Sequence, residues 1–208
     1  NNIVIIGCLI ILYSGELYMI KLTKRDPEQA KIDLLIYFAE QVKGRKKPVC
    51  QSIEVSKELA RPWKEWDFSG KEGQTSLYYP PVKKSSQIQA RRVLIVGVGE
   101  KKEEQHEIRE QLRIAAGAAT SQARKCKAEK VCVVLPKTEG LDPKEMAESI
   151  TEGLLLANYQ FIKYKKMKND DKPFQVKSFS LSSQDKQASA IRRGMVRGRN
   201  AAVAACVA

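Results

Sequence analysis

The sequence predicts a layered α/β domain built on a mixed or largely parallel central sheet. Two observations support this class. Apolar runs of strand length alternate along the chain with longer stretches of helical periodicity. Most of these runs are apolar throughout, which is typical of strands covered on both faces. The chain has 208 residues, 43% of them hydrophobic, so it can bury one good-sized core.

The most apolar strand candidates are residues 32–38 (IDLLIYF) and 92–98 (RVLIVGV). Residues 131–135 form a third run of the buried type, in which Cys132 acts as a small hydrophobe. Residues 174–181 alternate between apolar and polar, so we expect that strand to be more exposed. Shorter strands are expected at residues 20–23 and 75–79, with a turn at residues 68–73.

Residues 101–125 predict a long helix, because their apolar residues recur near the 3.6-residue period. The segment begins with glutamates and ends with basic residues, an arrangement that suits the helix dipole. Its expected apolar face consists of Ile108, Leu112, Ala115, Ala116 and Ala119.

Further helices are expected on either side of this one. Asp142 and Pro143 predict a helix start, since aspartate caps helices well and proline suits the first turn. Ser182 or Ser183 predicts the cap of a last helix that runs to the end of the chain. A short helix is expected over residues 56–66, limited by its proline. The apolar side of the helix after Pro143 would carry Met146, Ile150, Leu154 and Ala157.

The chain begins with its most apolar run, residues 3–13 (IVIIGCLIILY). This run is too short for a membrane helix, which needs about 20 apolar residues. A signal peptide would need a basic stretch before it and a small-residue cleavage site after it, and neither is present. We therefore expect no membrane partner, and interpret residues 1–18 as an extension ahead of a domain that begins at Met19. A buried N-terminal strand is the alternative.

The cysteines and the single histidine limit the chemistry of the chain. The cysteine count is odd and no pair is spaced C-x-x-C, so we expect free thiols, a reducing compartment and a cytoplasmic protein. His106 lies in a highly charged stretch, where we expect an exposed helix face. No nucleophile motif accompanies it, so we assign no catalytic residue and no metal ligand to this chain. The cysteines are Cys8, Cys50, Cys126, Cys132 and Cys206.

The segment Gly97-Val98-Gly99 raises the question of a nucleotide-binding loop. A dinucleotide fingerprint needs a third glycine, whose place Lys102 occupies here. Glu100, Glu103 and Glu104 stand where a phosphate would dock, and no G-K-[ST] sequence exists. We therefore predict a strand-to-helix turn in which glycine relieves backbone strain, with no cofactor bound.

The charge balance brings nucleic acid into consideration. The chain has 37 Lys and Arg residues against 24 Asp and Glu, a formal charge of +13, and such a surplus attracts polyanions. An ordinary solvated surface is the alternative. Candidate nucleic-acid contacts are Arg45, Lys46, Lys47, Lys163, Lys165, Lys166, Lys168, Arg192 and Arg193, with Phe161 and Tyr164 as aromatic neighbours that either stack on bases or pack inward.

Several motifs occur in an order that is specific to one family. WDFSGKEGQTSLYY is followed by RRVLIVGVGEKKE, by the AAGAA sequence of residues 115–119, and by MAESITEGLLLANYQFIKYKK from Met146. A weaker element near the end has Gly194, Asn200 and Ala202, with alanine where the family often has arginine. Together these matches extend from Met19 to the C-terminus. The chain resembles the N-terminal domain of the leucyl aminopeptidase family, the cytosolic two-metal exopeptidases.

The resemblance implies a three-layer α/β/α, macro-like domain at residues 19–182. In that family two divalent metals, zinc or manganese, act in a following domain that releases N-terminal amino acids from peptides, and the enzyme forms hexamers. The metal-binding segments "K-G-x-x-x-D-x-G-G" and "N-T-D-A-E-G-R" do not occur here. We therefore expect residues 183–208 to be a linker helix toward that catalytic domain, and this chain alone to be inactive.

Three functions follow from these observations. The first is a non-catalytic aminopeptidase domain that serves assembly and access control. The second is a DNA-binding module that uses the basic surface. The third, ADP-ribose binding, rests on the macro-like fold alone and is disfavoured by the glutamates at residues 100–104.

Overall fold

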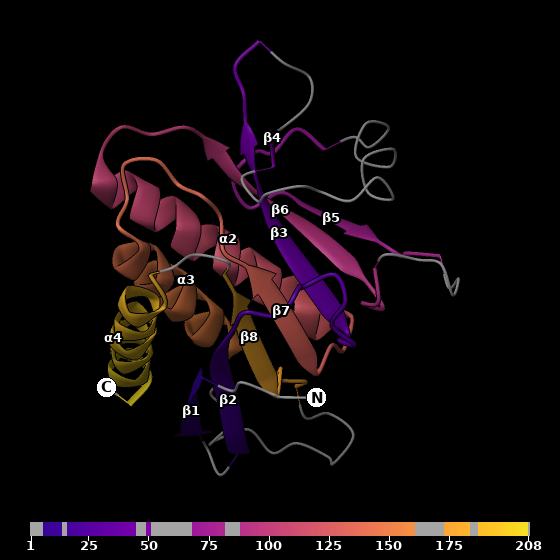
Figure 1. The fold of residues 1–208 in the computed structure, drawn as a ribbon, viewed down its shortest axis with the longest axis vertical. Helices are drawn as coiled ribbons and strands as arrows, with labels where there is room; N and C mark the ends of the chain where they lie inside the picture. The colour runs from indigo at the N-terminus through magenta and orange to yellow at the C-terminus, as the bar shows by residue number, and fades with distance from the viewer. Residues whose placement is uncertain are drawn as a thin grey trace.

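The computed structural model describes residues 6–13, 16–44, 49–50, 68–81, 88–160, 173–183 and 187–207. Eight strands in this part of the chain form one sheet, in the order β1-β2-β8-β7-β3-β6-β5, with β4 paired to β3 (Figure 1). The strands are β1 (Ile6–Tyr13), β2 (Glu16–Thr23), β3 (Leu34–Gln41), β4 (Val49–Cys50), β5 (Thr75–Tyr78), β6 (Val93–Glu100), β7 (Lys130–Val134) and β8 (Ser178–Ser182).

The sheet is mixed and mostly parallel, as the sequence predicts. The five central strands β2, β8, β7, β3 and β6 run parallel to one another. Three outer pairs are antiparallel: β1 with β2, β4 with β3, and β5 with β6. The α/β class is therefore confirmed.

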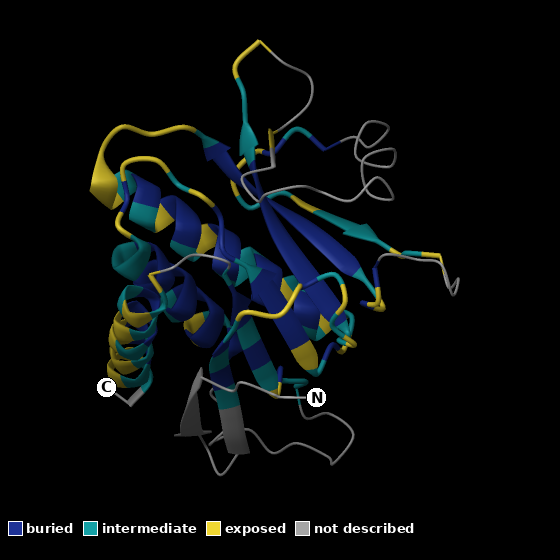
Figure 2. Ribbon diagram, in the orientation of Figure 1, coloured by how far each residue is buried: buried dark blue, intermediate teal, exposed yellow. Residues whose placement is uncertain are grey.

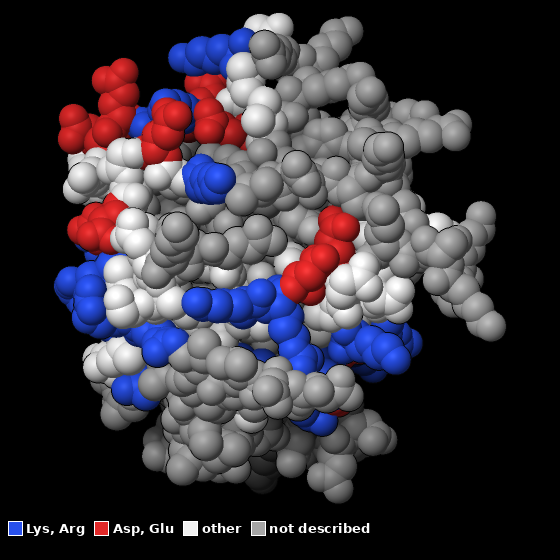
Figure 3. Space-filling view, in the orientation of Figure 1, with Lys and Arg blue, Asp and Glu red and all other residues white. Residues whose placement is uncertain are grey.

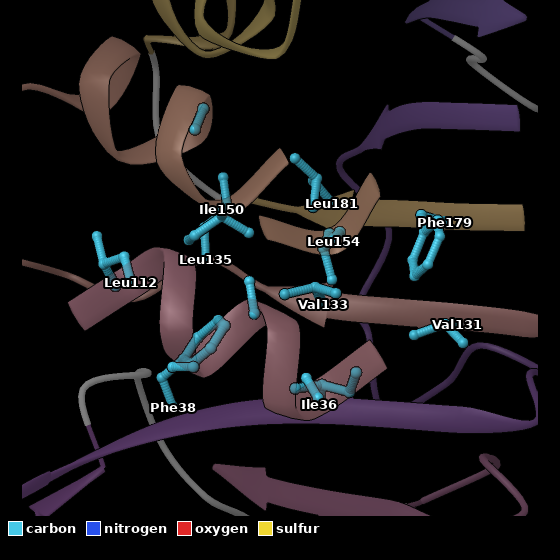
Figure 4. Close-up of a cluster of buried hydrophobic side chains, with 14 of the residues drawn as sticks. Ile36, Phe38, Leu112, Val131, Val133, Leu135, Ile150, Leu154, Phe179 and Leu181 are labelled. Carbon is cyan, nitrogen blue, oxygen red and sulfur yellow. The ribbon is translucent and has the colours of Figure 1, made fainter. Parts of the chain in front are cut away.

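Three helices cover one face of this sheet. They are α2 (Gln105–Lys125), α3 (Pro143–Asn158) and α4 (Ala188–Val207), and α3 lies between the other two (Figure 1). Alternate residues of the strands, such as Ile36 and Phe38 of β3, point toward these helices and meet Leu112 and Leu154 in the main core (Figure 4). Figure 2 shows β3 and β6 buried along most of their length. No helix in the described ranges is long and apolar enough to cross a membrane.

The opposite face of the sheet carries a second, smaller apolar cluster. Leu35 and Tyr37 of β3 pack there with Val93 and Cys132, together with Ile88. The helix that we expect over residues 56–66 lies outside the described residues. The helical layer described here is thus the one on the face of α2, α3 and α4.

The predicted helix faces agree with the structure. Ile108, Leu112, Ala115, Ala116 and Ala119 of α2 are all buried, and so are Met146, Ile150 and Leu154 of α3. The side chain of Asp142 accepts a hydrogen bond from the backbone N–H of Lys144 (2.8 Å), which confirms the predicted cap. His106 is exposed, and Cys126, Cys132 and Cys206 are free thiols.

One expectation about the end of the chain is confirmed in part and another is wrong. Strand β8 is more exposed than β3 and β6, because Ser178 and Ser180 are half-buried, although it lies inside the sheet between β2 and β7 with Phe179 and Leu181 fully buried. Neither predicted serine caps the last helix. Ser182 belongs to β8, Ser183 precedes the helix by several residues, and the carbonyl of Gln187 accepts the first-turn N–H groups of α4.

The first 18 residues contribute secondary structure to the sheet. Residues 6–13 form β1, which pairs with β2 from Ile6 opposite Leu22 to Tyr13 opposite Glu16. Strand β2 extends from Glu16, ahead of the expected strand at residues 20–23. Of the two interpretations of residues 1–18, an N-terminal strand is therefore the one that agrees with the backbone of residues 6–13.

Candidate functional site

The two motifs that come first in the chain meet at one edge of the sheet. The turn at residues 70–74 lies against the end of β6 and exchanges backbone hydrogen bonds with it. Gly73 donates to the carbonyl of Gly97 (3.0 Å), Gly97 to that of Gln74 (2.8 Å), and Gly99 to that of Gly70 (2.9 Å). The backbone of this turn therefore continues the sheet beyond β5.

These contacts explain why glycine stands at residues 97 and 99. A Cβ added to Gly97 would collide with the backbone of Lys71 and Gly70. Gly99 has a φ of +87°, which L-amino acids with side chains rarely adopt. Both residues thus serve close backbone packing and strain relief. The predicted strand-to-helix turn at residues 97–100 is wrong, because these residues belong to β6, which reaches Glu100, and the turn to α2 follows at residues 101–104.

The side chain of Gln74 holds the turn in shape. Its Oε1 accepts hydrogen bonds from the backbone N–H groups of Ser69 (3.0 Å), Gly70 (3.1 Å) and Lys71 (3.3 Å), and from the Ser69 hydroxyl (3.1 Å). Consecutive N–H groups that converge on one point form a nest that suits an anion or a carbonyl oxygen. In this chain the nest is filled by the protein's own amide.

A cavity of about 320 Å³ opens at the same edge, beyond the carboxyl ends of β3, β6 and β7. Ligands in open α/β sheets bind outside the carboxyl ends of the strands. The volume falls within the range of roughly 300–1,000 Å³ that is usual for small-molecule sites. The lining residues are Glu40, Val49, Val98, Glu100, Lys101, Lys102, Ile108, Gln111, Leu112, Lys137, Thr138 and Glu139.

Ion pairs order the charges around the cavity mouth. Lys101, after β6, meets Glu139, after β7, at 2.6 Å, so one pair joins the two loops. That hydrogen bond raises the pKa of Lys101 and lowers the pKa of Glu139. Lys102 pairs with Glu107 at 3.0 Å, and the bond raises the pKa of Lys102.

The cavity edge is richer in acidic side chains than the rest of this basic protein. Figure 3 shows red atoms gathered at the upper left, where Figure 1 places the end of β6 and the start of α2, and blue atoms in a band farther down. The glutamates of this region are Glu100, Glu103, Glu104, Glu107 and Glu139. Negative charge here disfavours phosphate groups, in agreement with the argument against a nucleotide loop.

The three helices are joined to one another by a second group of charges. Glu148 of α3, which is 8% exposed, meets Arg109 of α2 at 3.3 Å and Arg197 of α4 at 3.3 Å. Arg113 of α2 meets Glu152 of α3 at 2.6 Å. These pairs lie between helices and away from the cavity, so we interpret them as structural.

The candidate nucleic-acid contacts are only partly placed by the structure. Arg45, Lys46, Lys47, Lys163, Lys165, Lys166 and Lys168 lie outside the described residues, as do Phe161 and Tyr164. Arg193 is exposed on α4, whereas Arg192 is half-buried. Of the three basic segments, the structure therefore places only the one that contains Arg192 and Arg193.

Among the described residues, no group of three or more His, Cys, Asp or Glu side chains is close enough to hold a metal ion. The one adjacent aspartate pair, Asp170 and Asp171, lies outside the described residues.

Sequence reasoning did not find the cavity. Its apolar floor comes from residues that the sequence pattern assigns to the core, such as Val98 and Leu112. Its rim comes from the ends of β3 and β4 and from the loops after β6 and β7. The available signal was the acidic cluster after β6, which stands out in a chain of net charge +13.

Comparison with known proteins identifies the family. The model of the cytosol aminopeptidase family, N-terminal domain, matches residues 40–168. A probable cytosol aminopeptidase from Desulforapulum autotrophicum is 37% identical over 185 residues, which cover 87% of this chain and 36% of that protein. The chain thus spans little more than a third of the length of this relative.

Solved structures share the fold at lower sequence identity. A mutant of tomato leucine aminopeptidase has a TM-score of 0.62 at 18% identity, over 88% of this chain and 36% of that one. The bottromycin maturation enzyme BotP in complex with Mn has a TM-score of 0.57 at 19% identity, over 84% and 30%. The family model and the sequence relative agree with the motifs of residues 67–73, 92–99 and 115–119, and the chain belongs to the cytosol aminopeptidase family, of which it carries the N-terminal domain.

Proposed function

We propose that this chain is the non-catalytic N-terminal domain of a two-metal leucyl aminopeptidase that releases N-terminal amino acids from peptides. The observation that carries the proposal is the 37% identity to a probable cytosol aminopeptidase, whose own sequence is much longer than the 185 residues that match this chain. Zinc or manganese ions would be held by residues outside this sequence, where they would activate a water molecule and polarise the peptide carbonyl. The cytoplasm is the expected location.

The proposed role of the domain is assembly into a hexamer and control of access to the catalytic sites. The close packing of α4 on α3 supports a firm connection toward a following domain. Gly194 and Gly198 of α4 lie so close to α3 that an added Cβ would collide with the carbonyl oxygens of Lys144 and Glu148. A helix held this tightly would transmit the position of the domain to whatever follows it.

The test begins with the size and activity of the native protein. An antibody against this chain should detect a band much larger than 23.4 kDa in source cells. The purified native protein should hydrolyse a chromogenic leucine amide, lose that activity to a chelator and regain it with Mn²⁺ or Zn²⁺, while the 208-residue chain should be inactive. A native band at the size of this chain would contradict the proposal.

DNA binding is the second candidate function, favoured by the net charge of +13 and by the exposed Arg193. Neutralising phosphates with Lys and Arg gives a steep dependence of affinity on salt. The triple variant Lys165→Glu, Lys166→Glu, Lys168→Glu should lose affinity for a DNA duplex at low salt, and so should Arg193→Glu. Unchanged affinity in both variants would remove these surfaces from consideration.

A further inference from the structure

The cavity at the carboxyl edge of the sheet has an apolar floor. Val98, Ile108 and Leu112 are 5%, 6% and 2% exposed, and they line it from β6 and α2. At the rim, Val49 is 45% exposed, although a valine gains from being covered. The floor and rim therefore suit an apolar group of a ligand.

Polar groups of two kinds surround this floor. Glu40 and Glu100 supply carboxylates on the side of β3 and β6, and the Glu100 carboxylate also meets the Nζ of Lys43 at 3.3 Å. Lys137 and Thr138, adjacent on the loop after β7, supply an ammonium group and a hydroxyl group. Lys137 makes no ion pair with a described residue, and the buried Thr138 Oγ1 has no hydrogen-bond partner in the same ranges. A buried hydroxyl without a partner is costly, and a ligand oxygen would satisfy it once a small shift of the loop exposes the hydroxyl.

The ion pair between Lys101 and Glu139 closes part of the mouth between these two sets of groups. It joins the loop after β6 to the loop after β7 at 2.6 Å. The side chain of Lys101 is 60% exposed and that of Glu139 is 86% exposed, so the pair can open at little energetic cost. A small ligand could enter here, whereas a polymer would meet the two loops.

We propose that this cavity binds a free apolar α-amino acid. The side chain of the amino acid would lie on Val98, Ile108 and Leu112, its ammonium group would face Glu40 and Glu100, and its carboxylate would face Lys137 and Thr138. The proposal rests on the proposed function, since an aminopeptidase releases such molecules, and it gives this domain a means of sensing product.

Binding of L-leucine to the 208-residue chain, measured by isothermal titration calorimetry, tests the proposal. Saturable binding is expected, with weaker binding of 4-methylpentanoate, which lacks the ammonium group, and of isopentylamine, which lacks the carboxylate. Lys137→Glu should raise the Kd for L-leucine about tenfold, because a hydrogen bond to a charged group is lost. Thr138→Val should weaken binding less.

The matched control is Lys125→Glu, an equal charge change on the exposed last residue of α2, at the opposite edge of the sheet. It should leave the Kd unchanged. The proposal is overturned if L-leucine gives no saturable heat, if Lys137→Glu and Lys125→Glu behave alike, or if ADP-ribose binds more tightly than L-leucine. Because this assay needs no turnover, its failure is separate from failure of the aminopeptidase assay on the native protein.

Discussion

We expect two glycines at the contact between α2 and α3 to change the stability of the protein in opposite directions when each is replaced by alanine. Gly153 of α3 faces the backbone of Arg113, and a Cβ there would collide with the Arg113 carbonyl oxygen and lie 3.0 Å from the Cβ of Ala116. Gly117 of α2 has space, because its nearest neighbour would be the Cβ of Ala157 at 3.8 Å. Both glycines lie inside helices.

The magnitudes follow from helix propensity and packing. Changing glycine to alanine in a helix interior gains about 0.8–1.0 kcal/mol. Overpacking costs about 1–3 kcal/mol, and the upper part of that range applies at Gly153 because backbone must move. We therefore expect Gly117→Ala to stabilise the protein by up to about 1 kcal/mol and Gly153→Ala to destabilise it by about 2 kcal/mol.

Thermal unfolding followed by circular dichroism measures the difference. At roughly 2–4 °C per kcal/mol for a chain of this size, a difference of about 3 kcal/mol separates the two Tm values by roughly 6–12 °C. Urea unfolding at fixed temperature gives the free energies independently. If Gly153→Ala proves as stable as the unchanged protein, the helices are not in the close contact described here and the reasoning is refuted.

Three further predictions concern buried polar groups. Asn158 is 3% exposed and exchanges two hydrogen bonds, of 3.0 and 2.9 Å, with the backbone of Val176, ahead of β8. Asn158→Ala should therefore lower the free energy of unfolding by about 2–4 kcal/mol in urea titrations, and a loss below about 0.5 kcal/mol would contradict this. Glu148→Gln should lower the free energy of unfolding by about 1–2 kcal/mol, because it weakens the ion pairs of α3 with α2 and α4. Glu110→Gln, at a side chain that is 59% exposed, should lower it by less than about 0.5 kcal/mol. Equal losses in urea titrations would contradict the role of Glu148 between the helices. Burial raises the pKa of Cys132 from 9.0 to about 12, so the thiol ionises in the unfolded chain before it ionises in the folded protein. The contribution of the neutral thiol to the free energy of unfolding is therefore complete below pH 9 and falls toward pH 12 by about 1.4 kcal/mol per pH unit. Cys132→Ala should reduce the slope of the free energy of unfolding against pH in that window.

The central strands were predictable because hydrophobic burial leaves a direct record in the sequence. The run IDLLIYF overlaps most of β3, whose residues from Leu34 to Phe38 are buried on alternating faces in two different clusters. Strand β8 was predictable only in part. Its sequence SFSLS alternates, and Ser178 and Ser180 are half-buried as expected, but the alternation does not show that the strand lies inside the sheet between two neighbours.

The candidate site could be predicted only in fragments. The sequence shows that Gly97 and Gly99 lack a phosphate-binding pattern, but it does not show that both lie in β6 or that the segment at residues 70–74 packs against them. The cavity is similarly hidden, because Lys101 and Glu139 are 38 residues apart and meet only when β6 and β7 lie on either side of β3. Contacts set by strand order are invisible to local periodicity.

The position of β8 between β2 and β7 has a consequence for synthesis on the ribosome. Met19 of β2 is paired with Ser178 of β8, so β2 finds its parallel neighbour only after the other described strands have been made. At about 5–20 residues per second, the interval is roughly 8–32 s. During that time β2 can pair only with β1, and its other edge has no neighbouring strand. The sheet is therefore completed by a late step, in which β8 enters between β2 and β7.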